Sequence, residues 1–481
     1  MATTRRLRAT RPAQPALEPG IDAIRRQMDL PGAFPPEVEA AAAQAAAHPR
    51  LPSLDRTDIA FVTVDPPGAM DLDQALHVER DGDGYVVHYA IADVAAFVSP
   101  GDAVDLEAHR RGETLYGAAS KIPLHPPVLS EDAGSLLPDV VRPALLWTIT
   151  LDRTGEGTHV DVRRALVRSR ERLDYGGLQA RIDGGDADPM WQVLREIGEL
   201  RIQREQRRGG VSLPLPDQEI EVREDGCWQL KFRARHPVED WNEQISLLTG
   251  MAGAHLMTTH GVGLLRTLPE PHPEAIARLR RTARGLHIAW PDDCDYPAFI
   301  RSLDPAEPRH VAMMIACTSV LRGAGYVAFQ GDVPAQPMHS ALASTYTHVT
   351  APLRRLVDRY TGELCVALCA GQPPPAWVLE ALPGLPATMA DADRRAGQYE
   401  RAVIDLAETL VLASEVGKRF AATVVEIDRR DRHQGVVVLE ELAIEARAGS
   451  PDPLPLGASV QVELVAADPA SRKVEFQVVG A

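Results

Sequence analysis

The C-terminal stretch, residues 418–481, constrains the fold most, because it reads as short strands separated by turn residues. The strand-like segments are, in order, FAATVVEID, QGVVVLEE, LAIEARA, ASVQVELVAAD and KVEFQVV. A small sheet of such strands leaves unpaired edges unless it closes on itself. A five-stranded OB-fold barrel provides that closure in a short chain. The sequence therefore predicts an OB-fold β-barrel over residues 417–481.

The part before this barrel mixes strands with helices. The whole chain has 481 residues, more than one hydrophobic core ordinarily serves. Strand patterns occupy residues 59–170 and include the hairpin signal DGDG at 81–84. Helical patterns dominate from 191 to 416. We predict an α+β fold in which one large mixed domain, residues 51–416, precedes the barrel.

Residues 1–50 are rich in Arg, Pro and Ala and are predicted to form a separate, partly helical segment. Helices are expected around residues 21–28 and 36–47. The second has Pro36 at its start and an Ala-rich body, both of which favour a helix. The first twenty residues have the composition of a disordered segment.

Composition narrows the class of protein. A net charge of -16 argues against a protein that coats nucleic acid nonspecifically, although a local basic channel stays compatible with it. The five cysteines form no CxxC pair, so neither a zinc ribbon nor a disulfide framework is expected. No apolar run is long enough to span a bilayer, and no secretory leader or GxxxxGK[ST] loop occurs. We expect a cytoplasmic protein that binds no membrane and uses no ATP, and we take it to be a monomer.

Four polar side chains gather in the stretch TVDPPGAMDLDQALHV, residues 63–78: Asp65, Asp71, Asp73 and Gln74. Clustered carboxylates stay ionised together when a cation neutralises them, and hard oxygen ligands favour Mg²⁺ or Mn²⁺. Asp71 and Asp73 are two residues apart, so they share one side of an extended segment. Spacing alone leaves two interpretations open, a metal site and a solvated acidic turn.

The second segment whose side chains suit binding or catalysis is YTHVTAPLRRLVDRY, residues 346–360. Pro352 predicts a helix start, which would place Arg354 and Arg355 in the first helical turn. Guanidinium groups there suit a phosphate, for which arginine is a bidentate donor, but a solvated pair of arginines is an equally good interpretation. His339 and His348 flank the segment, and a structural role is the favoured interpretation for both.

Together, these segments resemble the catalytic domain of the ribonuclease II / ribonuclease R family. TVDPPGAMDLDQA resembles the metal loop [TI]-[IV]-D-x5-D-x-D-D-A, and YTHVTAPLRRLVD resembles YxHFTSPIRRYxDL. The stretches AIADVAAFV, LPDVVRPAL and YERAVID resemble further family segments, in the family's order, and the terminal barrel resembles its RNA-binding OB-fold. The resemblance implies a processive 3'→5' exoribonuclease that degrades single-stranded RNA to nucleoside 5'-monophosphates with Mg²⁺ or Mn²⁺.

The resemblance also implies roles for particular residues. Asp65, Asp71 and Asp73 match the metal-binding aspartates, and Asp71 and Asp73 are further expected to be catalytic. Arg354 matches the arginine that contacts the scissile phosphate and stabilises charge there. Gln74 stands where the family has a fourth acid; its amide oxygen could still bind a metal, though it brings no charge.

Three further residues match positions at which the family binds RNA. Tyr116, seven residues before Pro123, and Tyr175, in RLDYGGLQ, match aromatic side chains near the 3' end of the RNA. Glu400, in YERAVID, matches a glutamate that holds the 3'-terminal nucleotide. Core packing is the alternative for the two tyrosines.

Two departures from the family pattern qualify these expectations. Gln74 removes one acid, so we expect weaker Mg²⁺ binding, and a catalytically impaired RNA-binding or regulatory protein on the same fold is the alternative function. Residues 1–50 are too short for one of the family's cold-shock barrels, so we expect weaker RNA binding at high salt.

Overall fold

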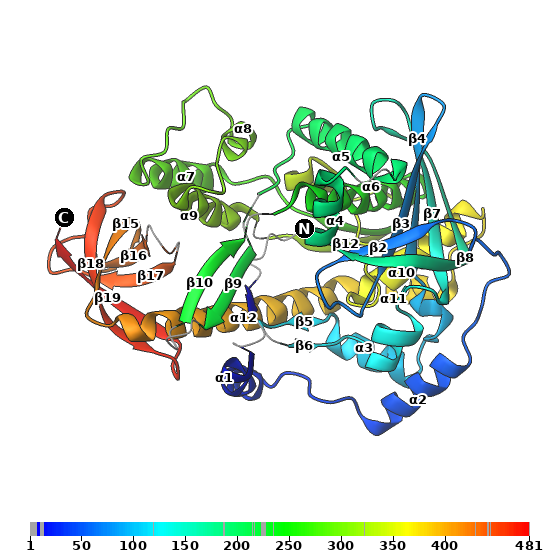
Figure 1. Ribbon diagram of the computed structural model, residues 1–481, viewed down its shortest axis with the longest axis horizontal. Coiled ribbons are helices and arrows are strands. Elements are labelled where there is room, and N and C mark those ends of the chain that lie inside the picture. Colours follow the sequence, from blue (N-terminus) through cyan, green and yellow to red (C-terminus); the bar gives the residue numbers. More distant parts are fainter. Residues whose placement is uncertain are drawn as a thin grey trace.

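Figure 1 shows the computed structural model, with two β-barrels at opposite ends of the molecule and helices between them. The structure describes the following residues: 7–9, 14–118, 120–185, 188–213, 215, 217–222, 228–233, 235–321, 323–428, 430–439, 442 and 444–480. Cys227 lies outside them. No helix in this described part of the chain has both the length and the apolar character needed to cross a membrane.

The first barrel is a closed sheet with the strand order β2-β3-β4-β7-β8. Its strands are β2 (Phe61–Asp65), β3 (Gln74–Asp81), β4 (Gly84–Ala92), β7 (Val141–Leu151) and β8 (Gly157–Asp174). The DGDG signal forms the β3–β4 turn as predicted: Asp81 pairs with Gly84, and Gly82 has a φ of 59° that a residue without a Cβ adopts at low cost. β2 and β8 run parallel, and the other neighbours in this barrel are antiparallel.

Helices cover this barrel and fill the space between the two barrels. They are α3 (Ala103–Arg111), α4 (Tyr175–Asp183), α5 (Pro189–Arg207), α6 (Pro237–His260), α7 (Pro273–Gly285), α8 (Tyr296–Arg301), α9 (Pro308–Cys317), α10 (Leu356–Cys369), α11 (Ala376–Ala381) and α12 (Leu385–Leu412). Trp147 on β7 is fully buried in the core that α5, α6 and α10 share with the barrel. This apolar packing holds the barrel strands in place against the helices.

Short strands form the remaining small sheets. They form two-stranded sheets from β5 (Leu115–Tyr116) with β6 (Lys121–Ile122), β11 (Val262–Thr267) with β12 (Gly325–Gln330), and β13 (Met338–His339) with β14 (Ser344–Thr345). A three-stranded sheet has the order β1 (Leu7–Ala9), β9 (Asp217–Val222), β10 (Trp228–Arg233). The β5–β6 hairpin matters most below, because it reaches the acidic loop.

The second barrel confirms the OB-fold prediction for the C-terminus. Its closed order is β15-β16-β17-β19-β18. The strands are β15 (Arg419–Ile427), β16 (Gln434–Leu439), β17 (Glu445–Gly449), β18 (Ser459–Asp468) and β19 (Lys473–Gly480). α12 runs from the large domain to this barrel (Figure 1), and both belong to one apolar core.

The N-terminal segment contains more structure than the sequence predicted. α2 (Pro36–Ala47) agrees with the prediction, but α1 (Gln14–Gln27) begins seven residues earlier than expected. The prediction of a disordered first twenty residues is therefore wrong for residues 7–9 and 14–20. The cause is tertiary: Leu17 and Ile21 are buried against α12, where a Cβ on Gly20 would come within 2.6 Å of Leu406.

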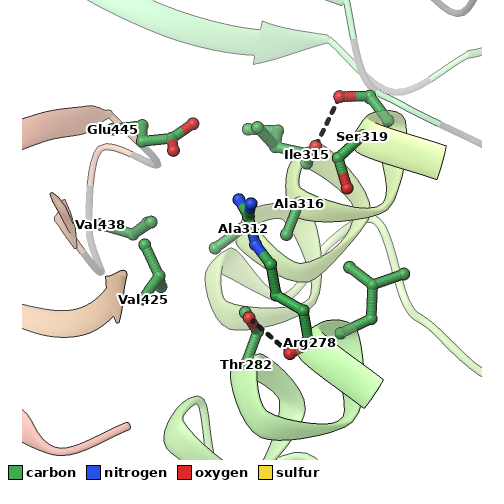
Figure 2. Close-up of a pocket in the computed structure, with 11 residues that line it drawn as sticks. Arg278, Thr282, Ala312, Ile315, Ala316, Ser319, Val425, Val438 and Glu445 are labelled. Carbon is green, nitrogen blue, oxygen red and sulfur yellow. Dashed lines mark hydrogen bonds between the residues drawn. The ribbon is translucent and has the colours of Figure 1, made fainter. Parts of the chain in front are cut away.

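A small cavity of about 50 Å³ lies where α7 and α9 meet the second barrel, and Figure 2 shows the side chains around it. Arg278 on α7 borders the cavity and forms an ion pair with Glu426 of β15 at 2.9 Å. Nearby, a Cβ on Gly285 would lie 2.5 Å from the Cα of Gly457, so helix and barrel backbones approach directly. The cavity lies at the interface between the helices α7 and α9 and the C-terminal barrel, and none of the predicted site residues lines it.

Candidate active site

The acidic segment is the loop that joins β2 to β3, with Asp65 as the last residue of β2 and Gln74 as the first of β3. Ser135 fixes the loop: its Oγ accepts from the Leu72 N–H at 3.0 Å and donates to the Met70 carbonyl at 2.6 Å. The Leu72 side chain is fully buried. Anchoring Leu72 in the core places its neighbours Asp71 and Asp73 together on the other side of an extended segment.

Asp73 is the most buried of the three acids and faces the arginine segment. Its Oδ1 accepts a hydrogen bond from the Leu353 N–H at 2.7 Å, and its Oδ2 lies 3.5 Å from Nε of Arg354. Burial raises the pKa of Asp73 to about 8, with a further contribution from the like charge of Asp71, while Arg354 opposes the rise. The predicted catalytic acid and the predicted arginine therefore lie side by side.

Asp65 carries a carboxylate oxygen that has no partner. Its Oδ2 is buried and forms no hydrogen bond. Burial, followed by repulsion from Asp71, raises the pKa of Asp65 to about 7, against the attraction of Arg354 and Arg172. An oxygen buried without a donor costs free energy that a bound cation would recover.

Asp71 is a like charge to both of the other acids and has partners of its own. Lys121 Nζ is 2.7 Å from Oδ1 of Asp71, and the Tyr116 hydroxyl is 3.4 Å from Oδ2. Lys121 also forms an ion pair with Glu131 at 2.9 Å. Sequence reasoning missed Lys121, although the β5–β6 register, which pairs Tyr116 with Lys121, places it directly across from a predicted RNA-binding residue.

The donor set suits a divalent cation, although the side chains are not arranged around one. In the described part of the chain, no three His, Cys, Asp or Glu side chains are grouped so that they could hold a metal ion as they stand. Asp73 is turned toward Leu353 and Arg354, and Asp71 toward Lys121. The donor set fits a divalent cation for two chemical reasons. Carboxylates are hard oxygen ligands, and one oxygen of Asp65 has no partner. In addition, Asp71 repels both Asp65 and Asp73, and a bound cation would offset this repulsion.

Gln74 has both ends of its amide engaged. Its Nε2 donates to the Thr350 carbonyl at 2.7 Å, and its Oε1 accepts from the Tyr89 hydroxyl at 2.5 Å. Gln74 thus ties the first barrel to the segment that carries Arg354. Its predicted role as a metal ligand would require the bond from Tyr89 to break or to be shared.

Replacing Gln74 with Leu will lower the free energy of unfolding by about 2–4 kcal/mol, because the Thr350 carbonyl and the Tyr89 hydroxyl lose their partner. Urea denaturation of wild type and Gln74→Leu measures this change. If the amide keeps these two partners when metal binds, Mn²⁺ affinity measured by calorimetry will stay within about threefold of wild type. A large loss of Mn²⁺ affinity with little loss of stability would instead show that Gln74 is a ligand.

The arginine segment differs from its predicted structure in one respect. α10 begins at Leu356, so Arg354 and Arg355 precede the helix, and the prediction that they lie in its first turn is wrong. The backbone there pairs with the chain before β5: the Thr114 N–H donates to the Arg354 carbonyl at 3.0 Å, and Glu113 forms a bridge with Arg355. Residues 354 and 355 are therefore paired with the chain before β5, and α10 begins only after them.

Only one of the two arginines is available to a substrate. Arg355 is buried and forms two hydrogen bonds with Asp358, at 2.8 and 2.9 Å, which also accepts from the Ala351 N–H. The side chain of Arg354 is 36% exposed beside Asp73. Arg355 therefore orders the segment, while Arg354 presents its guanidinium to the site.

The two flanking histidines are buried, in agreement with a structural role. His348 Nδ1 shares a hydrogen bond of 2.6 Å with the Tyr326 hydroxyl, and burial lowers the pKa of His348 well below its usual range. Burial likewise lowers the pKa of His339 to about 3. Both imidazoles are thus neutral at physiological pH.

The three predicted RNA-binding residues occupy different elements around the acidic loop. Tyr116 on β5 is 48% exposed. Tyr175 begins α4, and its hydroxyl accepts from Nδ2 of Asn242 at a long 3.4 Å. Glu400 is half-buried on α12, next to Tyr399, whose hydroxyl would lie 2.6 Å from a Cβ on Gly117 after β5. The hydroxyl of Tyr116 lies 3.4 Å from Oδ2 of Asp71.

Comparison with known proteins extends this picture. The family model "RNB domain" matches residues 54–369, and the model "RNase II-type exonuclease C-terminal S1 domain" matches residues 418–479. The domain divisions predicted at residues 50/51 and 416/417 lie close to these limits and stay predictions. The second match covers the OB-fold barrel described above.

Individual relatives are longer than this chain. The exosome complex exonuclease dis3 of Schizosaccharomyces pombe is 29% identical over 324 residues, which are 63% of this chain and 33% of that protein. Ribonuclease R of Mycoplasma genitalium is 26% identical over 397 residues, 78% of this chain and 54% of the relative. The chain thus spans between a third and about half of these two relatives.

Solved structures show the same fold. The structure of M. genitalium RNase R in complex with ribose methylated single-stranded RNA has a TM-score of 0.82 and 22% identity, covering 97% of this chain and 78% of that one. Yeast Ssd1, described as a pseudonuclease, has a TM-score of 0.69 and 18% identity, covering 96% of this chain and 58% of its own.

Proposed function

This chain belongs to the RNB-domain family, and we propose that it is a processive 3'→5' exoribonuclease that hydrolyses single-stranded RNA to nucleoside 5'-monophosphates. One observation carries the proposal: the partly exposed side chain of Arg354 lies 3.5 Å from the carboxylate of Asp73, next to Asp65 and Asp71. A cation-binding cluster next to an arginine suits a phosphodiester that must be held and cleaved.

Each residue then has a task. Asp65, Asp71 and Asp73 would hold a divalent cation, which when bound supplies an activated water and stabilises the leaving oxygen. Arg354 binds the scissile phosphate and neutralises the charge that develops on it. Tyr116 is exposed, with its hydroxyl 3.4 Å from Asp71, and offers a ring on which a base near the 3' end can stack.

Tyr175 and Glu400 complete the proposed RNA contacts, Tyr175 as a second aromatic near the 3' end and Glu400 as the residue that holds the terminal nucleotide. Exoribonucleases of the RNB family depend on divalent metal ions in general. For this chain we propose Mg²⁺, with Mn²⁺ as the ion that compensates better for the missing fourth acid. We further propose that it acts in the cytoplasm, as a monomer and without ATP.

The alternative is a catalytically impaired RNA-binding or regulatory protein on the same fold. Two observations favour it: Gln74 is held by Tyr89 and Thr350, and the fold is shared with a pseudonuclease. Against it stands the contact between Arg354 and Asp73, for which an RNA-binding module has no need. Digestion of RNA decides between the two.

The test is digestion of a 5'-labelled single-stranded oligo(A) with Mg²⁺ or Mn²⁺. We expect the label to pass from full-length RNA to a short end product, with few intermediates, while unlabelled AMP accumulates. We expect oligo(dA) to stay intact because DNA lacks the 2'-hydroxyl. RNA that is bound but not shortened with either ion, even at equimolar enzyme, would establish the alternative. Equal digestion of oligo(dA) would point to a less selective nuclease.

A further inference from the structure

The central acid of the site is held on both oxygens by one hairpin. Lys121 on β6 and Tyr116 on β5 are directly opposite each other, and they contact Oδ1 and Oδ2 of Asp71 at 2.7 and 3.4 Å. The ammonium therefore lies at an oxygen that a cation would need. Asp71 is also the like charge that both Asp65 and Asp73 face.

Lys121 has a second carboxylate close by. Its Nζ is 2.9 Å from Oε1 of Glu131, which belongs to the helical turn Leu129–Ala133 and lies outside the acidic loop. The Lys121 and Glu131 side chains are 25% and 31% exposed, so neither is fully buried. If Asp71 were occupied by another cation, Lys121 would keep Glu131 as a counter-ion without a change of backbone.

We propose that Lys121 is a positioning residue that competes with the divalent cation for Asp71, and that Glu131 is the carboxylate to which it withdraws. This rests on the proposed function, because the competition matters only where Asp71 binds a cation. An ammonium and a divalent cation at one carboxylate repel each other, so the pair Lys121–Glu131 sets how tightly the site takes up metal.

The proposal makes two predictions of opposite sign for metal uptake. Lys121→Met removes the competitor and will tighten Mn²⁺ binding about tenfold. Glu131→Gln leaves Lys121 with Asp71 alone and will weaken Mn²⁺ binding about threefold. Lys418→Met, which breaks an exposed ion pair with Glu415 of 2.5 Å, will leave the affinity unchanged and is the matched control.

Isothermal calorimetry with MnCl₂ alone, on the full chain and without RNA, measures these affinities, and melting curves check that each variant is folded. A general loss of structure would weaken binding in both variants, so only the competition gives opposite signs. Unchanged or weaker binding in folded Lys121→Met, or no Mn²⁺ binding by wild type, would overturn the proposal. If Lys121→Met does not fold, Glu131→Gln decides alone, and its unchanged or tighter binding overturns the proposal.

The outcome is separable from that of the proposed function. Calorimetry needs no hydrolysis, so the Lys121 proposal stands if the affinities shift as described while RNA stays intact. Conversely, RNA digestion with unshifted affinities would reject only the role given to Lys121.

Discussion

Asp73→Asn will lower the rate of RNA hydrolysis by about a thousandfold while leaving the fold and RNA binding intact. Asparagine has the same shape, and its Oδ1 can still accept from the Leu353 N–H. Asp73 is almost fully buried beside Arg354, and burial raises its pKa, so its carboxylate is costly to keep ionised unless a cation binds nearby. Loss of the charge removes a metal ligand and a catalytic group together.

The measurement is the rate of AMP release under single-turnover conditions, with RNA affinity from fluorescence anisotropy. Asp83→Asn, the same substitution in the exposed β3–β4 turn, is the control and should retain full activity. Activity of Asp73→Asn within tenfold of wild type would remove Asp73 from the catalytic set. It would then favour a site centred on Asp65 and Asp71.

Arg354→Lys will lower kcat about a hundredfold and change KM little, because lysine keeps the charge but loses the planar, bidentate donor set. The backbone of residue 354 is fixed by the hydrogen bond from Thr114, so the shorter reach of lysine cannot be recovered by a shift of the chain. Steady-state kinetics on oligo(A) separates the two constants. A raised KM with an unchanged kcat would show that Arg354 contributes only to binding.

The neighbouring arginine supplies a contrasting control. Arg355 is buried and bonded to Asp358, so Arg355→Lys will act mainly on stability, lowering the free energy of unfolding by about 2–3 kcal/mol. Its kcat, corrected for the folded fraction, should stay near that of wild type. If both substitutions lowered kcat equally, the distinction between the two arginines would be lost.

The local patterns in the sequence predicted the parts of the fold that depend on neighbours in the chain. The OB-fold barrel followed from closely spaced strands, and the β3–β4 hairpin from DGDG. The start of α10 was predicted wrongly, because Pro352 is a local signal whereas the pairing of Thr114 with Arg354 is not. α1 was underestimated for the same reason, since its apolar face is completed by α12.

The site likewise contains residues that the sequence predicted and residues that only tertiary contacts bring in. The spacing of Asp71 and Asp73 indicated a shared face, and the family resemblance placed Arg354 with them, as the structure does. Lys121 could not be predicted, because it reaches Asp71 through the turn of a hairpin fifty residues later in the chain. The engagement of Gln74 also depends on distant partners, Tyr89 and Thr350. Which charges meet in a site is decided by tertiary packing, and no local pattern records it.

α12 is one continuous helix that connects the large domain to the C-terminal barrel. A helix of 28 residues extends about 42 Å, and one end shares its core with the C-terminal barrel while Tyr399 and Glu400 lie midway along it. The β5 side of the site and the C-terminal barrel are thus connected by one continuous helix. If the chain is the proposed exoribonuclease and the barrel also binds RNA, a shrinking strand would leave the barrel at one defined length, and products of that length would accumulate.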